Sequence, residues 1–110
     1  MAEKERNCQL RILPPAQREL EEIALLHKAL SGAASARRVT DGLFDAMRLL
    51  TLFPLSAPTI REAELRRMGF RYVISDRYLI FYRLIGDTVF VYHIVHGKTD
   101  YPTLLLSEFL

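Results

Sequence analysis

Side chains capable of acid–base or phosphate chemistry gather in the second half of the chain. His96 could act as a general base, since the ordinary pKa of an imidazole is about 6.5. Lys98 follows it closely, and Arg71 offers a planar fork that binds phosphate or carboxylate. These three residues are the candidates for catalysis. Arg71 and Lys98 are also candidates for contacting a partner, together with Arg83 and Tyr101.

Each of these side chains also has an ordinary structural interpretation. Arg71 could pair with Asp76 or with a loop carbonyl, and His96 could cap the end of a strand. Arg83 would either anchor a partner or extend along the sheet edge to water. Lys98 would either contact a target or remain a solvated turn residue. The sequence leaves these alternatives open.

The types and spacing of the residues do not indicate a metal site or a disulfide. The histidines, His27, His93 and His96, lack the carboxylate spacing of a metal site. His93 is expected to pack inside the fold, and His27, on the first helix, either to pack or to lie at the surface. Cys8 is the only cysteine, so no disulfide forms within the chain and cysteine-rich zinc modules are excluded. We therefore expect no metal and no cofactor.

The composition predicts one globular domain over residues 1–110, with residues 1–7 flexible and an apolar tail over 101–110. Apolar residues make up 50% and charged residues 25%, which excludes general disorder. No apolar run approaches the roughly 20 residues that span a bilayer, and the N-terminus lacks a secretory signal. A cytoplasmic protein is expected. The net charge of +2 is too small to diagnose nucleic-acid binding.

The elements that must position these side chains can be read from hydrophobic spacing. Cys8–Leu13 alternates like a short strand, and two helices are predicted after it, over residues 15–30 and 35–53. Gly32 should end the first helix and Ser35 should cap the second, while Pro54 ends it. Gly42 predicts a close approach of the second helix to the first.

Three strand signals follow a proline-containing loop, over residues 65–75, 78–85 and 88–95. Short turns between them indicate an antiparallel meander. The predicted fold class is therefore α+β, with an N-terminal strand, an antiparallel helical hairpin and three further strands (β-α-α-β-β-β). Both faces of Tyr78–Ile85 are largely apolar, although a hairpin covers only one face. The second face needs cover from the chain's own tail or from a partner.

Four features in this order resemble toxins of the RelE/ParE superfamily, from bacterial type II toxin–antitoxin modules. They are a strand leading into a helix (LRILPPAQRELEEI), a helical hairpin with a proline-containing loop at 54–58, the segment GFRYVISDRYLIFYRL, and the ending HIVHGKTD. The resemblance covers roughly residues 9–105. It implies a small toxin neutralised by a cognate antitoxin. Within the superfamily, RelE-like members cut messenger RNA on the ribosome, whereas ParE-like members poison DNA gyrase.

The match departs from the RelE pattern at the positions that would supply catalysis. Val73 and Ser75 stand where RelE-like enzymes have lysines, and Leu79 and Thr99 stand where they have arginines. The late catalytic tyrosine is replaced by apolar residues near Leu105. The resemblance therefore favours the ParE side. The alternatives are a metal-independent endoribonuclease of the RelE type and a degenerate relative that only binds antitoxin.

The resemblance also implies partners. A cognate antitoxin should wrap the toxin with a segment that folds on binding, adding a strand to a sheet edge or a helix to an apolar groove. A homodimer or a heterotetramer with the antitoxin is expected. DNA gyrase is the expected target, with the ribosome and messenger RNA as the alternative. Surplus apolar surface predicts that the isolated chain is poorly soluble until the antitoxin is coexpressed.

Overall fold

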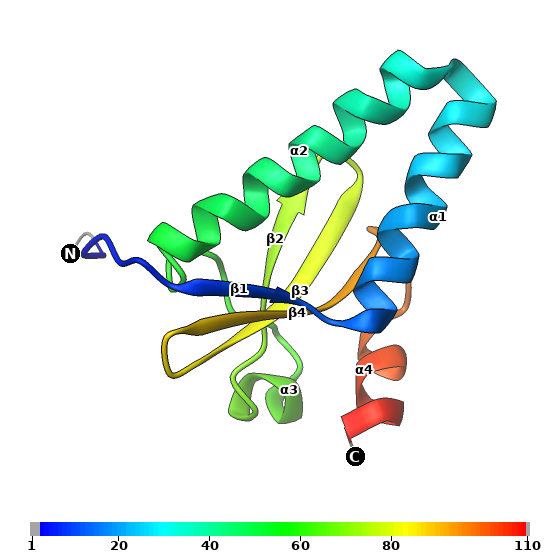
Figure 1. Cartoon of the computed structure of the whole chain (residues 1–110). Helices are drawn as coiled ribbons and strands as arrows, with labels where there is room; N and C mark the ends of the chain where they lie inside the picture. Colours follow the sequence, from blue (N-terminus) through cyan, green and yellow to red (C-terminus); the bar gives the residue numbers. More distant parts are fainter. Residues whose placement is uncertain (1–2, 110) are drawn as a thin grey trace.

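The computed structural model describes residues 3–109, which fold as a four-stranded sheet between two layers of helices (Figure 1). The long helical hairpin covers one face of the sheet, and two short helices lie on the other side. The elements in chain order are β1 (Gln9–Ile12), α1 (Pro14–Ser31), α2 (Ala33–Leu52), α3 (Ala63–Arg67), β2 (Arg71–Ser75), β3 (Tyr78–Ile85), β4 (Thr88–His96) and α4 (Tyr101–Phe109). The predicted α+β class and element order are confirmed.

The sheet is mixed, in the order β1-β4-β3-β2. β2, β3 and β4 form the antiparallel meander that their short turns predict. β1 runs parallel to β4, a pairing that the sequence did not indicate. The hairpin that follows β1 carries the chain to β2 at the opposite edge of the sheet, so β1 pairs with a strand that comes much later in the chain. β1 pairs only as far as Val91, so the rest of β4 is a free edge.

The two long helices meet without a loop, at Gly32. Its φ of 90° lies in a region that favours glycine, and the same residue ends α1 and precedes α2. Ser35 therefore lies inside α2 instead of capping it. Gly42 does approach a neighbour closely, but the neighbour is Ser75 on β2 and not α1 as predicted. A Cβ at position 42 would lie 3.4 Å from the Ser75 Oγ.

The segment before β2 begins with a helical turn where the sequence indicated strand. The Glu62 carboxylate accepts a hydrogen bond from the Glu64 amide at 3.0 Å and so caps α3. Leu65 is fully buried by this turn. The capped turn and the apolar anchor make residues 63–67 helical, so the strand begins only at Arg71.

Two apolar cores lie on the two faces of the sheet. The first, between the sheet and the helical hairpin, centres on Leu43, Met47 and Ile80. The second lies on the opposite face, where Leu105 of α4 and Leu65 of α3 pack against Phe81. The chain's own tail thus covers much of the second face, which was one of the two predicted alternatives.

The ends of the chain are partly described. Arg6, in the segment expected to be flexible, donates its amide to the carbonyl of Leu52, and the amide of Cys8, just after that segment, donates to the carbonyl of Thr51. These bonds hold residues 6–8 beside the end of α2. Residues 1–2 and residue 110 lie outside the described residues.

A bulge in β4 changes which way its side chains face. Phe81 pairs with His93, whereas the next residue of β3, Tyr82, pairs with Val91. Tyr92 is therefore the extra residue of β4. Bulges of this kind redirect side chains near a strand edge. As a result Val91 and Ile94, three positions apart, both lie in the core under the hairpin, whereas an unbroken strand would place them on opposite faces.

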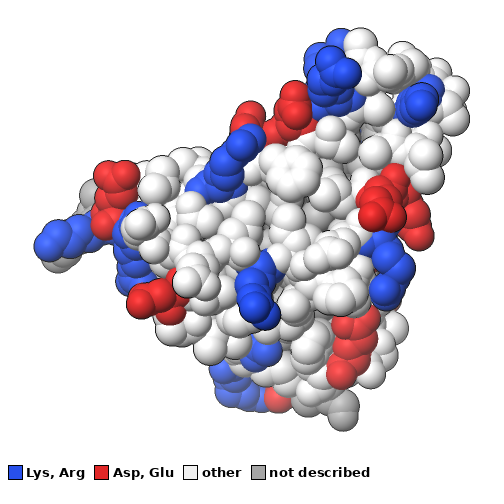
Figure 2. All heavy atoms as spheres, in the orientation of Figure 1, with Lys and Arg blue, Asp and Glu red and all other residues white. Residues whose placement is uncertain are grey.

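The surface carries apolar side chains on both long helices. On the face in Figure 2, most charged side chains lie towards the rim, although basic atoms also lie near the centre, and uncharged atoms fill much of the space between them. The exposed large apolar side chains of the hairpin are Leu25, Leu26, Leu30, Phe44 and Leu49. Among the described residues, none of the helices combines the length and the apolar character that spanning a membrane requires.

Candidate functional site

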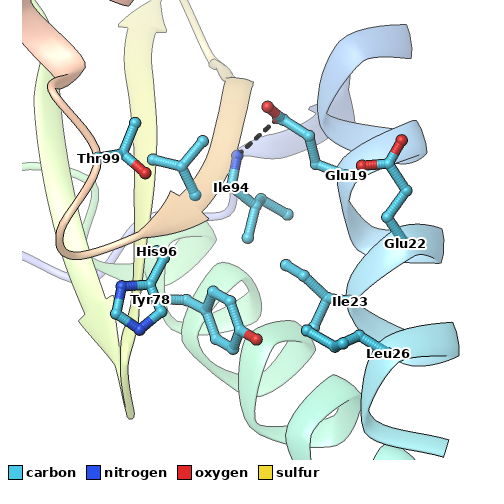
Figure 3. Close-up of a pocket in the computed structure, with 9 residues that line it drawn as sticks. Glu19, Glu22, Ile23, Leu26, Tyr78, Ile94, His96 and Thr99 are labelled. Atoms are coloured by element: carbon cyan, nitrogen blue, oxygen red, sulfur yellow. Dashed lines mark hydrogen bonds between the residues drawn. The ribbon is translucent and has the colours of Figure 1, made fainter. Parts of the chain in front are cut away.

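A cleft of about 310 Å³ lies between α1 and the free edge of β4 (Figure 3). Glu19 and Glu22 line its α1 side, and His96 and Thr99 line the side formed by the end of β4. Its remaining lining is mostly apolar and consists of Ile23, Leu26, Tyr78, Ile94 and Val95. The cleft can hold an apolar side chain beside an acidic wall and an exposed imidazole.

His96 is the one candidate catalytic residue that lines this cleft. Its Nδ1 accepts a hydrogen bond from the Lys98 amide at 3.1 Å, and its ring lies edge-on to Tyr78. The side chains of His96 and Lys98 are exposed. The backbone bond corresponds to the capping role that the sequence offered as an alternative, and the exposed ring remains open to a partner.

Arg71 lies away from these two residues. It pairs with Tyr82, four residues along β3 from Tyr78, which pairs with His96. That offset corresponds to about 13 Å of strand. The Arg71 guanidinium donates to the carbonyls of Ala57 at 2.7 Å and Leu55 at 3.3 Å, and so braces the loop after α2.

Arg83 lies on the opposite face of the sheet from Arg71, within the aromatic core under α4. Its Nε and Nη2 donate to the Tyr92 hydroxyl at 3.0 and 2.7 Å. Its guanidinium carbon lies 5.0 Å from the centre of the Phe70 ring and 5.8 Å from that of Phe109. Arg83 therefore forms cation–π contacts inside the fold.

Tyr101 begins α4 and is half-buried. Its ring packs on Phe81, with 4.8 Å between ring centres. The four residues predicted to contact a partner, Arg71, Arg83, Lys98 and Tyr101, thus do not share one surface. Their role toward a partner stays a prediction.

His93 is the titratable residue that sequence reasoning missed. It was expected to pack, and it is buried, but both ring nitrogens contact carboxylates, from Glu19 and Glu108. These residues are 74 and 15 positions away in the chain. No short-range spacing could reveal the arrangement.

A second cleft, of about 340 Å³, lies between the tip of the helical hairpin and the β2–β3 turn. Serines and two arginines, Arg38 and Arg77, line it together with Asp76. Arg77 lies 3.6 Å from the Asp76 carboxylate, so part of this charge is already paired.

The structure brings together only part of the predicted set of catalytic candidates. The structure gathers His96 and Lys98 but not Arg71. Over residues 3–109 it shows no group of His, Cys, Asp and Glu side chains that could hold a metal ion.

Comparison with known proteins identifies the family. The model of the ParE toxin of type II toxin–antitoxin systems (parDE) matches residues 10–101. A structure of the chromosomal ParDE toxin–antitoxin system from P. aeruginosa is similar, with a TM-score of 0.70 and 16% sequence identity. The similarity covers 84% of this chain and 98% of that one, and at this identity it concerns the fold. A search of curated protein sequences finds no match.

The two findings agree with the order of elements seen here. The matched region runs from β1 to the start of α4 and so includes the whole sheet and the hairpin. The predicted resemblance is confirmed on its ParE side. The chain belongs to the ParE toxin family of type II toxin–antitoxin systems.

Proposed function

We propose that this ParE-family toxin acts by binding DNA gyrase and that a cognate antitoxin neutralises it. The family match over residues 10–101 is the observation that carries the proposal. The placement of the charged side chains supports binding over hydrolysis, because Arg71 is separated from His96 and engaged by its own loop. A cytoplasmic location follows from the proposed target.

Ribonuclease action would need a different arrangement. Cleavage of RNA without a metal requires a base for the 2′-hydroxyl, a cation for the phosphorane and an acid for the leaving oxygen. The apolar or short side chains of Val73, Ser75, Leu79 and Thr99 occupy the positions where the RelE pattern places cations. This composition supports the gyrase proposal.

The deciding experiment follows plasmid supercoiling in cells within minutes of inducing the chain without antitoxin. The same samples are probed for cleaved messenger RNA. Loss of supercoiling with intact messages is the expected result. Intact supercoiling with cleaved messages would overturn the proposal in favour of the ribonuclease, and no effect on either would indicate a relative that only binds antitoxin.

A His96→Ala variant makes this experiment sharper. A general base contributes about 10²- to 10⁴-fold to a rate, so a ribonuclease using His96 would lose its effect in this variant. A gyrase poison has no such step, and we expect the variant to keep its effect on supercoiling. Lys4→Ala, at an exposed site, is the control variant and should keep the effect of the wild-type chain. His27 is unsuitable as a control position because it is buried and hydrogen-bonded to Tyr78.

Of the predicted partner residues, Lys98 is the one whose side chain is exposed. We propose that it contacts an acidic segment of the antitoxin. Lys98→Glu should weaken the complex by mutual repulsion, measured as a rise in Kd by titration calorimetry. Lys4→Glu makes the same charge change away from the cleft and should leave Kd unchanged. Equal Kd values for both variants would exclude Lys98 from the interface.

A further inference from the structure

A buried histidine joins three elements that meet at the free edge of β4. His93 Nδ1 lies 2.9 Å from Glu19 Oε2 of α1, and His93 Nε2 lies 2.8 Å from Glu108 Oε2 of α4. The His93 side chain is 5% exposed, against 22% for Glu19 and 38% for Glu108. We call these three residues the histidine clamp.

The clamp needs both ring protons. A neutral imidazole carries one N–H and therefore donates to one carboxylate, whereas the imidazolium donates to two. With both glutamates ionised, the observed geometry is satisfied only by the charged ring. Burial lowers the pKa of His93, but the hydrogen bonds and charges of Glu19 and Glu108 raise it more, so the pKa lies above its ordinary value.

Among the described residues, Glu19 and Glu108 are the charged side chains that pair with His93. β1 ends at Ile12, before it reaches His93, and β3 places the uncharged Phe81 opposite. Over residues 3–109, the structure shows no other salt bridge to Glu19 or Glu108. Glu19 of α1 and Glu108 of α4 are therefore the charged groups that favour the imidazolium against the effect of burial.

The two arms of the clamp differ in strength. Glu19 Oε1 also accepts a hydrogen bond from the Ile94 amide at 2.9 Å, which holds Glu19 in place independently of the ring (Figure 3). Glu108 is more exposed and has its bonds to His93 alone among the described residues. When the ring loses one proton, the bond to Glu108 is the one that should break.

We propose that the histidine clamp is a proton-dependent latch that docks the C-terminal helix α4 on the sheet. With both ring nitrogens protonated, Glu108 is held and α4 stays in place. Loss of one proton frees the end of α4, and Phe109 withdraws from the rings of Phe70 and Tyr92, 5.2 and 5.3 Å away. The latch concerns the chain's own conformation and stands whether or not gyrase is the target.

The direction of the pH dependence follows from the raised pKa of His93. The folded state binds this proton more tightly than the unfolded chain, whose histidine titrates at about pH 6.5. The stabilisation is fully present below that pH. It is lost as the pH rises through the folded pKa, so α4 loosens on the alkaline side.

The first test observes the ring directly in the full chain. Nitrogen-15 NMR of the histidine rings, recorded from pH 5 to pH 9, distinguishes protonated from bare ring nitrogens. We expect both nitrogens of His93 to be protonated at pH 6.5, because its pKa lies above the ordinary imidazole value. A bare ring nitrogen on His93 at pH 6.5 would overturn the latch, because one glutamate would then have to be the protonated partner.

The second test follows α4 by hydrogen–deuterium exchange of peptides covering residues 101–109, corrected for the pH dependence of intrinsic exchange. Protection should fall as the pH rises through the His93 titration, while peptides from α2 stay unchanged. Glu108→Gln should lower the pKa of His93 and remove the pH dependence of α4 protection. Each unit by which the pKa falls corresponds to about a tenfold weaker binding of the proton by the folded state. Glu22→Gln, a change on the same cleft without a bond to His93, is the matched control.

The latch can be tested even if a variant is less stable than the wild-type chain. The wild-type pH series tests the latch without any substitution, and protection of α4 that is constant from pH 5 to pH 9 would refute it. Protection that changes equally in Glu108→Gln and Glu22→Gln would assign the effect to general surface charge and would also refute it.

Discussion

At the scale of single residues, the charged side chains that could do chemistry largely serve the fold. Arg71 holds two carbonyls of the loop after α2, and Arg83 lies among aromatic rings under α4. An arginine suits both places because its flat guanidinium donates several bonds and stacks on rings. Residue type alone could not separate these uses from ligand binding.

Tyr82 allows a test at this scale. Its buried hydroxyl donates to the Pro54 carbonyl at 2.6 Å and so ties β3 to the end of α2. Tyr82→Phe leaves that carbonyl without its partner and should lower the free energy of unfolding by about 1–2 kcal/mol. Urea denaturation measures the change. Tyr72→Phe, on the neighbouring strand, is the control and should cost less. Equal losses would contradict a specific role for the Tyr82 bond.

The same hydroxyl predicts a pH effect. Burial raises the pKa of Tyr82 to about 12, with Arg71 lowering it and Glu3 raising it. Because the folded state holds this proton more tightly than the unfolded chain, stability should fall as the pH rises from about 10 towards 12. Absorbance titration of the phenolates should show a late step that Tyr82→Phe removes. Ionisation of all tyrosines at about pH 10 would contradict the burial of Tyr82.

At the scale of elements, the helical hairpin depends on two glycines with different roles. Gly32 joins α1 to α2 at a φ of 90°, whereas Gly42 lies inside α2 with Ser75 as its neighbour. The sequence predicted a turn near Gly32 correctly. It could not identify which element Gly42 approaches, because that depends on how the hairpin lies on the sheet.

The two positions should respond oppositely to alanine. Gly42→Ala should raise the free energy of unfolding by about 0.5 kcal/mol, because alanine favours the helix and the Ser75 hydroxyl can rotate away. Gly32→Ala should lower it by about 1 kcal/mol or more, because a side chain is strained at that φ. Thermal unfolding of both variants measures the difference. A destabilised Gly42→Ala would mean that Ser75 cannot move.

At the scale of the whole molecule, the two faces of the sheet differ in how they are covered. α4 and α3 cover the second face from within the chain, whereas the outer surface of the hairpin keeps exposed leucines such as Leu26 and Leu30, 51% and 71% exposed. Such surface is typical of a protein that binds a partner. The poor solubility of the isolated chain stays a prediction, and this exposed apolar surface supports it.

Solubility provides the test at this scale. The isolated chain should self-associate in size-exclusion chromatography, and coexpression with the antitoxin should prevent this. Leu26→Ser combined with Leu30→Ser should shift the isolated chain towards monomer, because it removes apolar surface without touching the core. Thr103→Ser, at an exposed site of α4, is a neutral control. A monomeric wild-type chain would contradict the expectation.

Local patterns were enough to predict the class, the order of elements and the family of this protein. Hydrophobic spacing, prolines and short turns act between residues close in the chain, so they mark the hairpin and the meander directly. Other features depend on contacts between distant residues. The parallel pairing of β1 with β4, the bulge at Tyr92 and the position of α4 arise from packing across the sheet.

The histidine clamp shows the difference most clearly. The sequence contains His93, Glu19 and Glu108, but no spacing connects residues that are 74 and 15 positions apart. They meet because β1 stops short of the end of β4, α1 crosses the free edge and α4 folds back over the other face. The charge of His93 is therefore a property of the folded chain, since the carboxylates that stabilise it come together only when these elements pack.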